Sequence, residues 1–200
     1  MGRRGVFGKS SGGYGSIVHA MLYPEFWAAA ACHSGDMGFE NSYLPGFLKA
    51  LPVYAKAGGV QAWVEATFAK LKIEDADVGR LELLGMCASY DPDPSQFMGV
   101  RLPLDMETAE LIPERWDNFR TWDPAVMVET RGAGLKTLKA LYVDCGDEDQ
   151  FALVYGARRL ARSLRKLGVT HRYEEFPDNH SNIDYRMDVS LPFLAAALSG

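Results

Sequence analysis

Cysteine, long apolar runs and excess positive charge are all scarce in this chain of 200 residues. Its 3 cysteines, Cys32, Cys87 and Cys145, are odd in number and lack CxxC spacing. This argues against a disulfide framework or a zinc site and favours reduced thiols in a cytoplasmic protein. The longest apolar run, residues 26–32, is far shorter than the ~18 residues of a membrane span. The net charge of −5 argues against nucleic-acid binding, which usually needs a basic face.

Short apolar segments alternate with helical patterns in the first and last thirds of the chain, and the length suits one domain. The first third predicts a strand at 5–7, a glycine-rich turn, a helix at 13–22 and a strand at 26–32. The last third predicts a strand at 140–143, a helix capped by Gly168, a strand at 169–176 and a helix at 183–198. Such alternation is typical of an α/β fold with a mostly parallel sheet.

The middle of the chain, residues 37–135, departs from this alternation. Apolar residues recur at helical spacing from Val60 to Leu71, and several prolines then interrupt the chain. We interpret 37–135 as a large helical insertion, or lid, within a single domain of residues 1–200. Four aromatic residues of this region are candidates for lining a pocket, with simple core packing as the alternative for each: Trp63, Phe68, Trp116 and Trp122.

The stretch GVFGKSSGGYGS, residues 5–16, contains two overlapping glycine-rich patterns. In one pattern, Gly8-Lys9-Ser10 would end a phosphate-binding loop. That loop needs a glycine five residues before Gly8, and a strand before that glycine. Arg3 occupies the glycine position, and only two residues precede it. A phosphate-binding loop is therefore not expected.

In the other pattern, Ser10 lies in the sharp strand-to-helix turn that presents a nucleophile. The residues two before and two after such a serine must be small, because strand, turn and helix pack closely. Gly8 and Gly12 meet this demand around Ser10, whereas Lys9 would clash in the equivalent place before Ser11. Ser10 is thus the candidate nucleophile, at the start of a helix whose first N–H groups can stabilise negative charge. A plain Gly/Ser loop is the alternative.

A serine nucleophile needs a base and an acid that orients the base, and acidic residues follow the strand at 140–143. Asp144, at the strand's end, suits a helix-side cap or an ion pair, while Asp147 and Asp149 lie in the loop before the next helix. We favour Asp149 over Asp147 as the acid. Helix N-capping by either residue is compatible with this role. A calcium-binding loop is the other alternative, but the alternating oxygen ligands of an EF-hand are absent from the sequence.

Four histidines compete for the role of the base. His19 lies in the first predicted helix, His171 in the last strand, and His33 ends the second strand, close enough to the site to contact substrate. His180 follows the last strand and precedes the last helix, which completes the order Ser, acid, His along the chain. We predict that His180 is the base and that His33 and Trp122 contribute to substrate binding.

Three segments together, GKSSGGYGS, CGDEDQF and FPDNHS, resemble the α/β-hydrolase superfamily, and within it the serine esterases related to esterase D and S-formylglutathione hydrolase. In that group the elbow reads G-x-S-x-G-G-x-G. The acid occupies a G-x-x-D-x-F pattern, which falls on Gly146, Asp149 and Phe151. The resemblance spans residues 5–198, with 37–135 matching loosely. It implies an α/β-hydrolase-type sheet and an esterase that uses no metal and no organic cofactor.

The chain departs from this family before the elbow, where members carry further strands and a loop that supplies the second oxyanion-hole N–H. Only the C-terminal half of the fold is therefore expected, and only the backbone N–H of Ser11 is assigned to the oxyanion hole. The strand before Ser10 becomes a sheet edge with apolar surface and unpaired N–H groups. We expect either a truncated version of a longer esterase or a homo-oligomer that pairs through this edge.

These observations predict a serine ester hydrolase with a small-molecule acyl ester as its substrate. Ser10 attacks the acyl carbonyl, His180 accepts the proton and Asp149 orients His180. Two alternatives remain. One is a prolyl-oligopeptidase-like serine peptidase with the same triad, and the other is a catalytically inactive or incomplete hydrolase fragment that acts as an interaction module.

Overall fold

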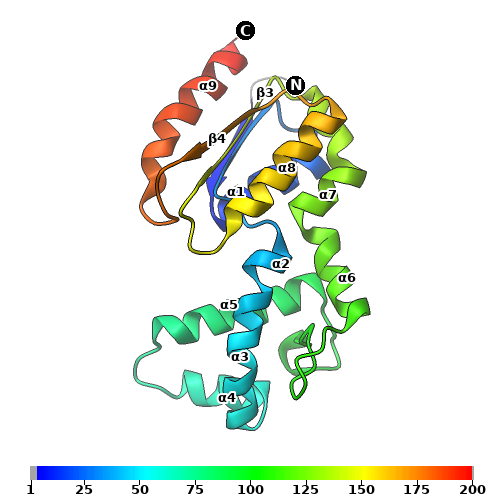
Figure 1. The fold of residues 1–200 in the computed structure, drawn as a ribbon, viewed down its shortest axis with the longest axis vertical. Helices are drawn as coiled ribbons and strands as arrows, with labels where there is room; N and C mark the ends of the chain where they lie inside the picture. Colours follow the sequence, from blue (N-terminus) through cyan, green and yellow to red (C-terminus); the bar gives the residue numbers. More distant parts are fainter. Residues whose placement is uncertain (1–3, 200) are drawn as a thin grey trace. The chain divides into compact units, whose positions relative to one another are not determined.

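The computed structural model describes residues 4–199 and divides the chain into two compact units (Figure 1). Unit 1 comprises Met1–Ser42 and Asp123–Gly200, and unit 2 comprises Tyr43–Trp122. Within residues 4–199, no helix combines the length and the apolar character that a membrane span requires.

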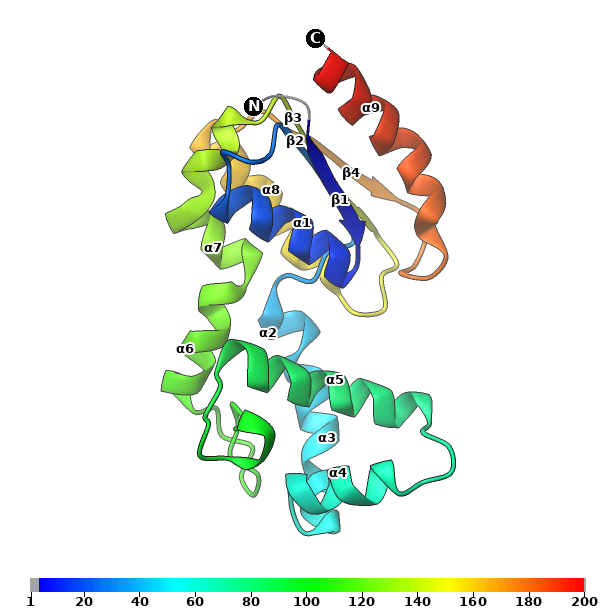
Figure 2. The same cartoon turned by 180° about the vertical axis from the view of Figure 1, so that it is seen from behind.

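Unit 1 is built on a sheet of parallel strands, which confirms the predicted α/β class (Figure 2). The strands are, in both chain order and sheet order, β1 (Gly5–Lys9), β2 (Ala29–His33), β3 (Ala140–Gly146) and β4 (Arg172–Phe176). β3 runs beyond the predicted 140–143, because its last residues still pair with β4. β4 begins later than predicted, because the N–H of Val169 is bonded to the Leu164 carbonyl, which closes the preceding helix at Gly168.

Helices cover both faces of this sheet. Those on one face are α1 (Ser11–Leu22), α7 (Pro124–Arg131) and α8 (Leu153–Leu167), while α9 (Met187–Ser199) packs on the other. Unit 1 also contains the short helix α2 (Phe39–Ser42) and two 3₁₀ turns, η2 (Gly132–Thr137) before β3 and η3 (Ile183–Arg186) before α9. Unit 1 therefore has three layers, with the sheet between helices.

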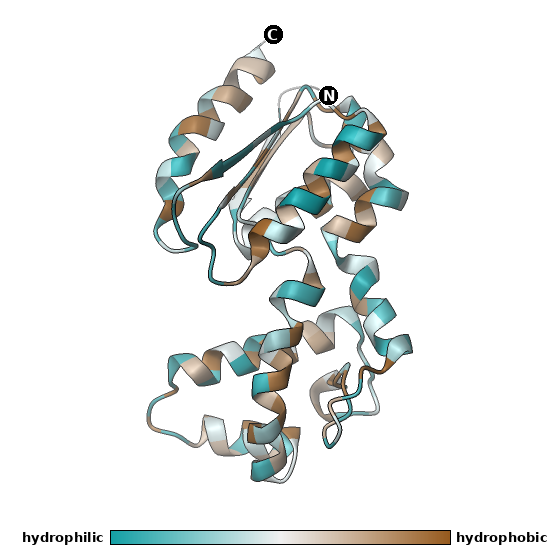
Figure 3. Ribbon diagram, viewed as in Figure 1, coloured by the Kyte–Doolittle hydropathy of each residue, from teal (hydrophilic) through white to brown (hydrophobic). Residues whose placement is uncertain are grey.

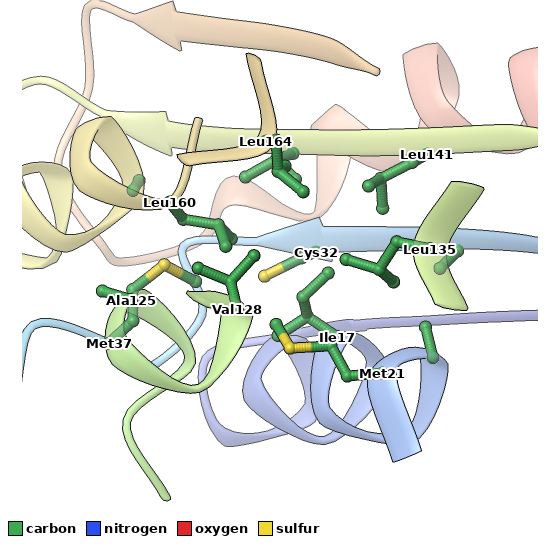
Figure 4. Close-up of a cluster of buried hydrophobic side chains, with 14 of the residues drawn as sticks. Ile17, Met21, Cys32, Met37, Ala125, Val128, Leu135, Leu141, Leu160 and Leu164 are labelled. Atoms are coloured by element: carbon green, nitrogen blue, oxygen red, sulfur yellow. The ribbon is translucent and has the colours of Figure 1, made fainter. Parts of the chain in front are cut away.

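Each face of the sheet has its own apolar core, because successive strand residues point to opposite sides. Cys32 and Leu141 face α1, α7 and α8, whereas Ala31 and Tyr142 face α9. Figure 4 shows the first core, in which the two strand residues meet helix residues that include Ile17, Val128, Leu160 and Leu164. The packing of these cores fixes the strand ends, and the candidate site lies at those ends.

The two edges of the sheet differ in character. β4 carries Arg172, Glu174 and Glu175, and Figure 3 shows it as largely hydrophilic. Such charges protect an edge strand from pairing with other chains. β1 reads GVFGK, and its Phe7 is 47% exposed. Among the residues that the structure describes, β1 is paired on one side only, so the expected sheet edge before Ser10 is confirmed.

Unit 2 is helical. It contains α3 (Leu44–Ala57), α4 (Val60–Phe68), α5 (Asp75–Tyr90) and α6 (Pro113–Trp122), with an irregular segment at 91–112 that includes η1 (Phe97–Gly99). Phe119 is the centre of its aromatic core and contacts the rings of Phe47, Tyr90 and Trp116. Trp63 is likewise buried, against Tyr54. Trp63 and Trp116 are thus core residues, as the packing alternative predicted.

Unit 2 is shorter than the predicted insertion of 37–135, because both flanks of that range belong to unit 1. The buried carboxylate of Asp123 joins these flanks. It accepts hydrogen bonds from the backbone N–H groups of Gly38, Phe39 and Ala125, each at 2.9 Å. The same side chain therefore caps α7 and holds the start of α2 (Phe39–Ser42).

Candidate active site

Ser10 occupies the sharp turn between β1 and α1 that the sequence predicted. Its backbone has φ 56° and ψ −128°, a conformation that a residue with a side chain rarely adopts. The backbone N–H of Ser10 donates to the His33 carbonyl at 2.9 Å, and the Ser10 carbonyl accepts from the N–H of Tyr14. A strained conformation of this kind persists only where its surroundings hold it, as they do in a nucleophile elbow.

The glycines around Ser10 have different steric roles. A Cβ on Gly8 would lie 2.4 Å from the backbone of Gly12, so a side chain there is excluded. A Cβ on Gly13 would lie 2.9 Å from the His33 carbonyl oxygen. A Cβ on Gly12 would meet none of the described atoms within 4 Å. The prediction that Gly12 must be small is therefore wrong, because its Cβ direction points to open space, and Gly13 is the second tight position.

Asp149 follows β3, and its Oδ2 lies 2.8 Å from His180 Nδ1. Its Oδ1 accepts from the backbone N–H of Phe151 at 2.9 Å and from that of Leu153, the first residue of α8, at 3.4 Å. The thiol of Cys145 lies 3.8 Å from Oδ2. Burial raises the pKa of Cys145 to about 12, so this thiol stays protonated and can donate to the carboxylate. The structure brings Asp149, rather than Asp147, to the histidine.

His180 lies between Asp149 and Ser10, with its Nε2 2.9 Å from Ser10 Oγ. An ionised carboxylate can only accept, so Nδ1 carries the proton towards Asp149 and Nε2 accepts from the serine hydroxyl. His180 is 9% exposed, and the Phe151 ring packs against it nearly at a right angle. Its backbone N–H donates to Gln150 Oε1 at 3.0 Å. Three side chains that are distant in the sequence thus form one hydrogen-bonded chain.

The loop that carries His180 passes very close to the end of β3. A Cβ on Gly146 would lie 2.2 Å from the Asp178 carbonyl oxygen, so only glycine fits at this crossing. Gly146 is part of the acid-bearing sequence pattern, and this close approach gives the steric reason for a glycine there. Gln150 and Cys145 were not predicted as neighbours of the site, although both lie within four residues of Asp149. Their proximity to Asp149 in the sequence was the available signal.

His33 does not lie where substrate could touch it. Its side chain is 1% exposed, and its two ring nitrogens contact Asp144 at 2.7 Å and Ser190 at 2.8 Å. The expectation that His33 contacts substrate is therefore wrong, because the side chain points into the sheet face under α9. His19 lies in α1 as expected, and His171 lies one residue before β4 rather than inside it.

Two roles stay predictions: that of the Ser11 backbone N–H in the oxyanion hole, and that of Trp122 in substrate binding. Ser11 is the first residue of α1, where a backbone N–H has no carbonyl one helical turn earlier to bond. The Ser11 hydroxyl donates to Asp36 Oδ2 at 3.0 Å. Trp122 belongs to unit 2 and is 36% exposed. Among residues 4–199, no group of three or more His, Cys, Asp or Glu side chains is arranged to hold a metal ion.

Comparisons with known proteins bear on the family and the fold of this chain. The family model described as "Putative esterase" matches residues 1–190. A ferulic acid esterase superposes with a TM-score of 0.50 at 16% identity, over 98% of this chain and 54% of its own. S-formylglutathione hydrolase from Staphylococcus aureus superposes with a TM-score of 0.52 at 16% identity, over 96% and 54%. An acylaminoacyl peptidase from Pyrococcus horikoshii gives 0.51 at 16% identity, over 98% and 24%.

The chain spans about half the length of the first two of these structures. At such identities the superpositions establish the fold, which is that of the α/β-hydrolases. A search of curated protein sequences gave no match. Because the family model covers nearly all of the sequence, this chain belongs to the esterase family of the α/β-hydrolase fold.

Proposed function

We propose that this chain is a serine hydrolase that cleaves small acyl esters through an acyl-enzyme. The observation that carries the proposal is the hydrogen-bonded chain from Ser10 through His180 to Asp149, at 2.9 and 2.8 Å, on a serine with φ 56°. Nucleophile, base and orienting acid within hydrogen-bond reach are the general signature of an activated serine. Membership of the esterase family and the likeness to known esterase structures support the same chemistry.

In the first half of the reaction, Ser10 Oγ attacks the carbonyl carbon of the ester while His180 Nε2 takes the hydroxyl proton. Asp149 accepts from the Nδ1 proton throughout, which keeps the ring in the productive tautomer and stabilises the imidazolium. When the tetrahedral intermediate collapses, His180 returns the proton to the leaving alcohol and the acyl group stays on Ser10. Cys145, which remains protonated beneath the carboxylate, gives Asp149 a further donor.

The negative charge on the carbonyl oxygen develops beside the start of α1. In this proposal the N–H of Ser11 donates to that oxygen, and the aligned peptide dipoles of the helix favour the negative charge. In the second half, His180 takes a proton from water, the resulting hydroxide attacks the acyl carbonyl, and Ser10 leaves with the proton. The acid product is released and the enzyme returns to its starting state.

The test uses a fluorophosphonate probe, which reacts only with an activated serine, together with hydrolysis of p-nitrophenyl acetate. The parent chain should label and should hydrolyse the ester. Ser10→Ala should lose both activities. Ser11→Ala is the matched control, because it removes a hydroxyl next in the chain but keeps the backbone N–H, and it should retain both.

Two outcomes would contradict the proposal. If the folded parent protein neither labels nor hydrolyses the ester, the inactive or incomplete hydrolase is the better description. If a peptide amide is cleaved in preference to the ester at matched leaving groups, the serine peptidase is the better description. Labelling that survives Ser10→Ala would place the nucleophile elsewhere.

A further inference from the structure

A row of polar residues crosses the sheet directly below the proposed nucleophile. The strand register pairs Lys9 with His33, His33 with Asp144, and Asp144 with Glu174, so all four strands contribute one residue at the same level. We call these four residues the polar row. Residues at one level of a parallel sheet share a face. This is the face that Tyr142 and α9 cover. On this side the row follows mostly apolar residues of β1, β2 and β3, whereas β4 also carries Arg172, whose guanidinium lies over the Tyr142 ring.

Every member of the polar row contacts the segment at 184–190, which follows His180 in the chain. Lys9 Nζ lies 4.0 Å from Asp184 Oδ1, and His33 Nε2 lies 2.8 Å from Ser190 Oγ. The other two members share one partner, Arg186.

Arg186 is the centre of these contacts. Its Nε donates to Asp144 Oδ2 at 2.9 Å, and its Nη2 donates to Glu174 Oε2 and to the Tyr142 hydroxyl. The guanidinium also lies over the ring of Phe176, with 4.5 Å between the guanidinium carbon and the ring centroid. Arg186 thus bonds to two neighbouring strands and covers the residue at which β4 gives way to the His180 loop.

The polar row is also connected to the nucleophile. Ser10 follows Lys9, and the Ser10 N–H is held by the carbonyl of His33. The N–H of Ser34, next to His33, donates to the Asp144 carbonyl at 2.8 Å. The backbone of the row therefore holds the elbow, while its side chains hold the segment behind His180. Both reacting groups are tied to the same four residues.

Stability alone gives a weak reason for this arrangement. Asp144 is fully buried and the Arg186 side chain is 12% exposed, so both charges lose most of their hydration. Buried ion pairs of this kind are often replaced by well-packed apolar residues with no loss of stability. An apolar row would lack the directional contacts that set the position of the 184–190 segment against the strand ends.

We propose that Arg186 is a positioning residue that acts through Asp144 and Glu174 to hold the loop of His180 in register with Ser10. This inference rests on the proposed function of Ser10 and His180. Arg186 is not assigned any contact with substrate. Its loss should misplace the imidazole slightly, and a small misplacement of a catalytic group lowers the rate of the chemical step far more than it weakens substrate binding.

The experiment compares Arg186→Met with Arg158→Met in the full chain. Arg158 offers a matched control, because it also forms an ion pair with a glutamate of β4, at 2.6 Å from Glu175, but lies on α8 across the sheet from the polar row. kcat is normalised to the number of serines that a fluorophosphonate probe titrates. Arg186→Met should lower kcat about 10- to 100-fold with KM within about twofold, and Arg158→Met should change neither.

Arg186→Lys should restore part of the lost kcat, because a lysine can still reach one carboxylate of the row. Glu174→Gln, which keeps the shape but removes one charged partner, should give a smaller fall in kcat and decides the question if Arg186→Met does not fold. A kcat per titrated site equal to the parent's in Arg186→Met, or in Glu174→Gln in that case, overturns the inference, whatever happens to the melting temperature. Full activity in Ser10→Ala would instead overturn the proposed function.

Discussion

At the elbow, the conformation of Ser10 and the space around Gly8, Gly12 and Gly13 determine which residues fit. The strained backbone of Ser10 is held by hydrogen bonds on both sides of the residue, and Gly8 lets α1 start directly above β1. Gly12 lies inside α1, where an added Cβ meets none of the described atoms. The elbow pattern has a glycine at both positions. The structure excludes a side chain at Gly8 but leaves room for one at Gly12.

This difference gives a direct prediction. Gly12→Ala should raise the free energy of unfolding by about 0.5–1 kcal/mol, because alanine loses less backbone entropy in a helix than glycine. Gly8→Ala should lower it by more than about 1 kcal/mol, because the Cβ overlaps the Gly12 backbone. Urea unfolding of both variants measures the two changes. Equal destabilisation by the two variants would show that α1 does not approach β1 as described.

At the scale of residues, the three side chains that the sequence singled out lie within hydrogen-bond distance of one another, whereas their surroundings were predicted less well. Ser10, Asp149 and His180 could be selected because the chemistry requires a serine between small residues and a fixed order of partners. His33 was misplaced for a physical reason. A histidine at a strand end can point to either side of the sheet, and its partners, Asp144 and Ser190, lie 111 and 157 residues away. No local pattern encodes those contacts.

Among the elements, β1 and β4 form opposite edges of the sheet and differ in how an edge is protected. β4 carries charged side chains, whereas β1 exposes Phe7 and glycine. An unprotected edge favours addition of a further strand. We propose that two copies of this chain pair through their β1 strands.

Self-association through β1 predicts an elution volume in size exclusion that falls as protein concentration rises. Phe7→Lys should shift the protein towards the monomer, because a lysine on an edge strand opposes pairing and removes the exposed ring. Phe26→Lys is a suitable control, since Phe26 is similarly exposed but lies outside the strands. A monomer at all concentrations, for the parent chain, would contradict the proposal.

The contacts of β4 also predict how stability depends on pH. Burial raises the pKa of Glu174, but hydrogen bonds from Tyr142, Arg172 and Arg186 outweigh it and hold the pKa below its ordinary value. The unfolded chain therefore binds the proton more readily, and the stabilisation is present above the ordinary glutamate pKa of ~4.3 and is lost as pH falls through the folded value.

Glu174→Gln should accordingly cost about 1.5 kcal/mol in the free energy of unfolding at pH 7. The difference from the parent should shrink as the pH falls below ~4.3. Urea unfolding at several pH values follows both chains. A difference that stays constant down to the lowest pH would mean that the charge of Glu174 does not contribute.

The elements themselves were largely predictable, and their ends were not. Gly168 marked the end of α8 correctly, because only a residue tolerant of φ 70° closes a helix in this way. β3 continued past 143 because Asp144 and Gly146 are buried by tertiary contacts, although both residues are rare in strands. Tertiary packing overrides local propensity at such positions.

For the molecule as a whole, the division into two units separates the proposed chemistry from the helical insertion. Ser10, Asp149 and His180 all belong to unit 1, and each unit has its own core. The expected range of 37–135 was too wide because Asp123 ties residues on both sides of unit 2 to unit 1. Such a contact joins positions about 85 residues apart, and no sequence pattern indicated it. The role of unit 2 as a lid stays a prediction.

The separate cores predict the effect of a substitution in unit 2. Phe119→Ala removes a fully buried ring and should lower the stability of unit 2 by about 3–5 kcal/mol. Fluorophosphonate labelling of Ser10 should persist, because the three residues of the proposed triad and their hydrogen-bond partners lie in unit 1. Thermal unfolding and labelling are measured on the same sample. Complete loss of labelling from protein whose unit 1 is still folded would contradict this.

Ser10 and His180 are separated by 170 residues, so the ribosome makes the proposed nucleophile well before the proposed base. Contacts between such distant positions form late in folding. If Ser10 and His180 act as proposed, the serine stays unreactive until β4 and the loop that carries His180 have left the exit tunnel. Probe labelling of ribosome-bound intermediates would therefore report when the nascent polypeptide acquires the proposed activity.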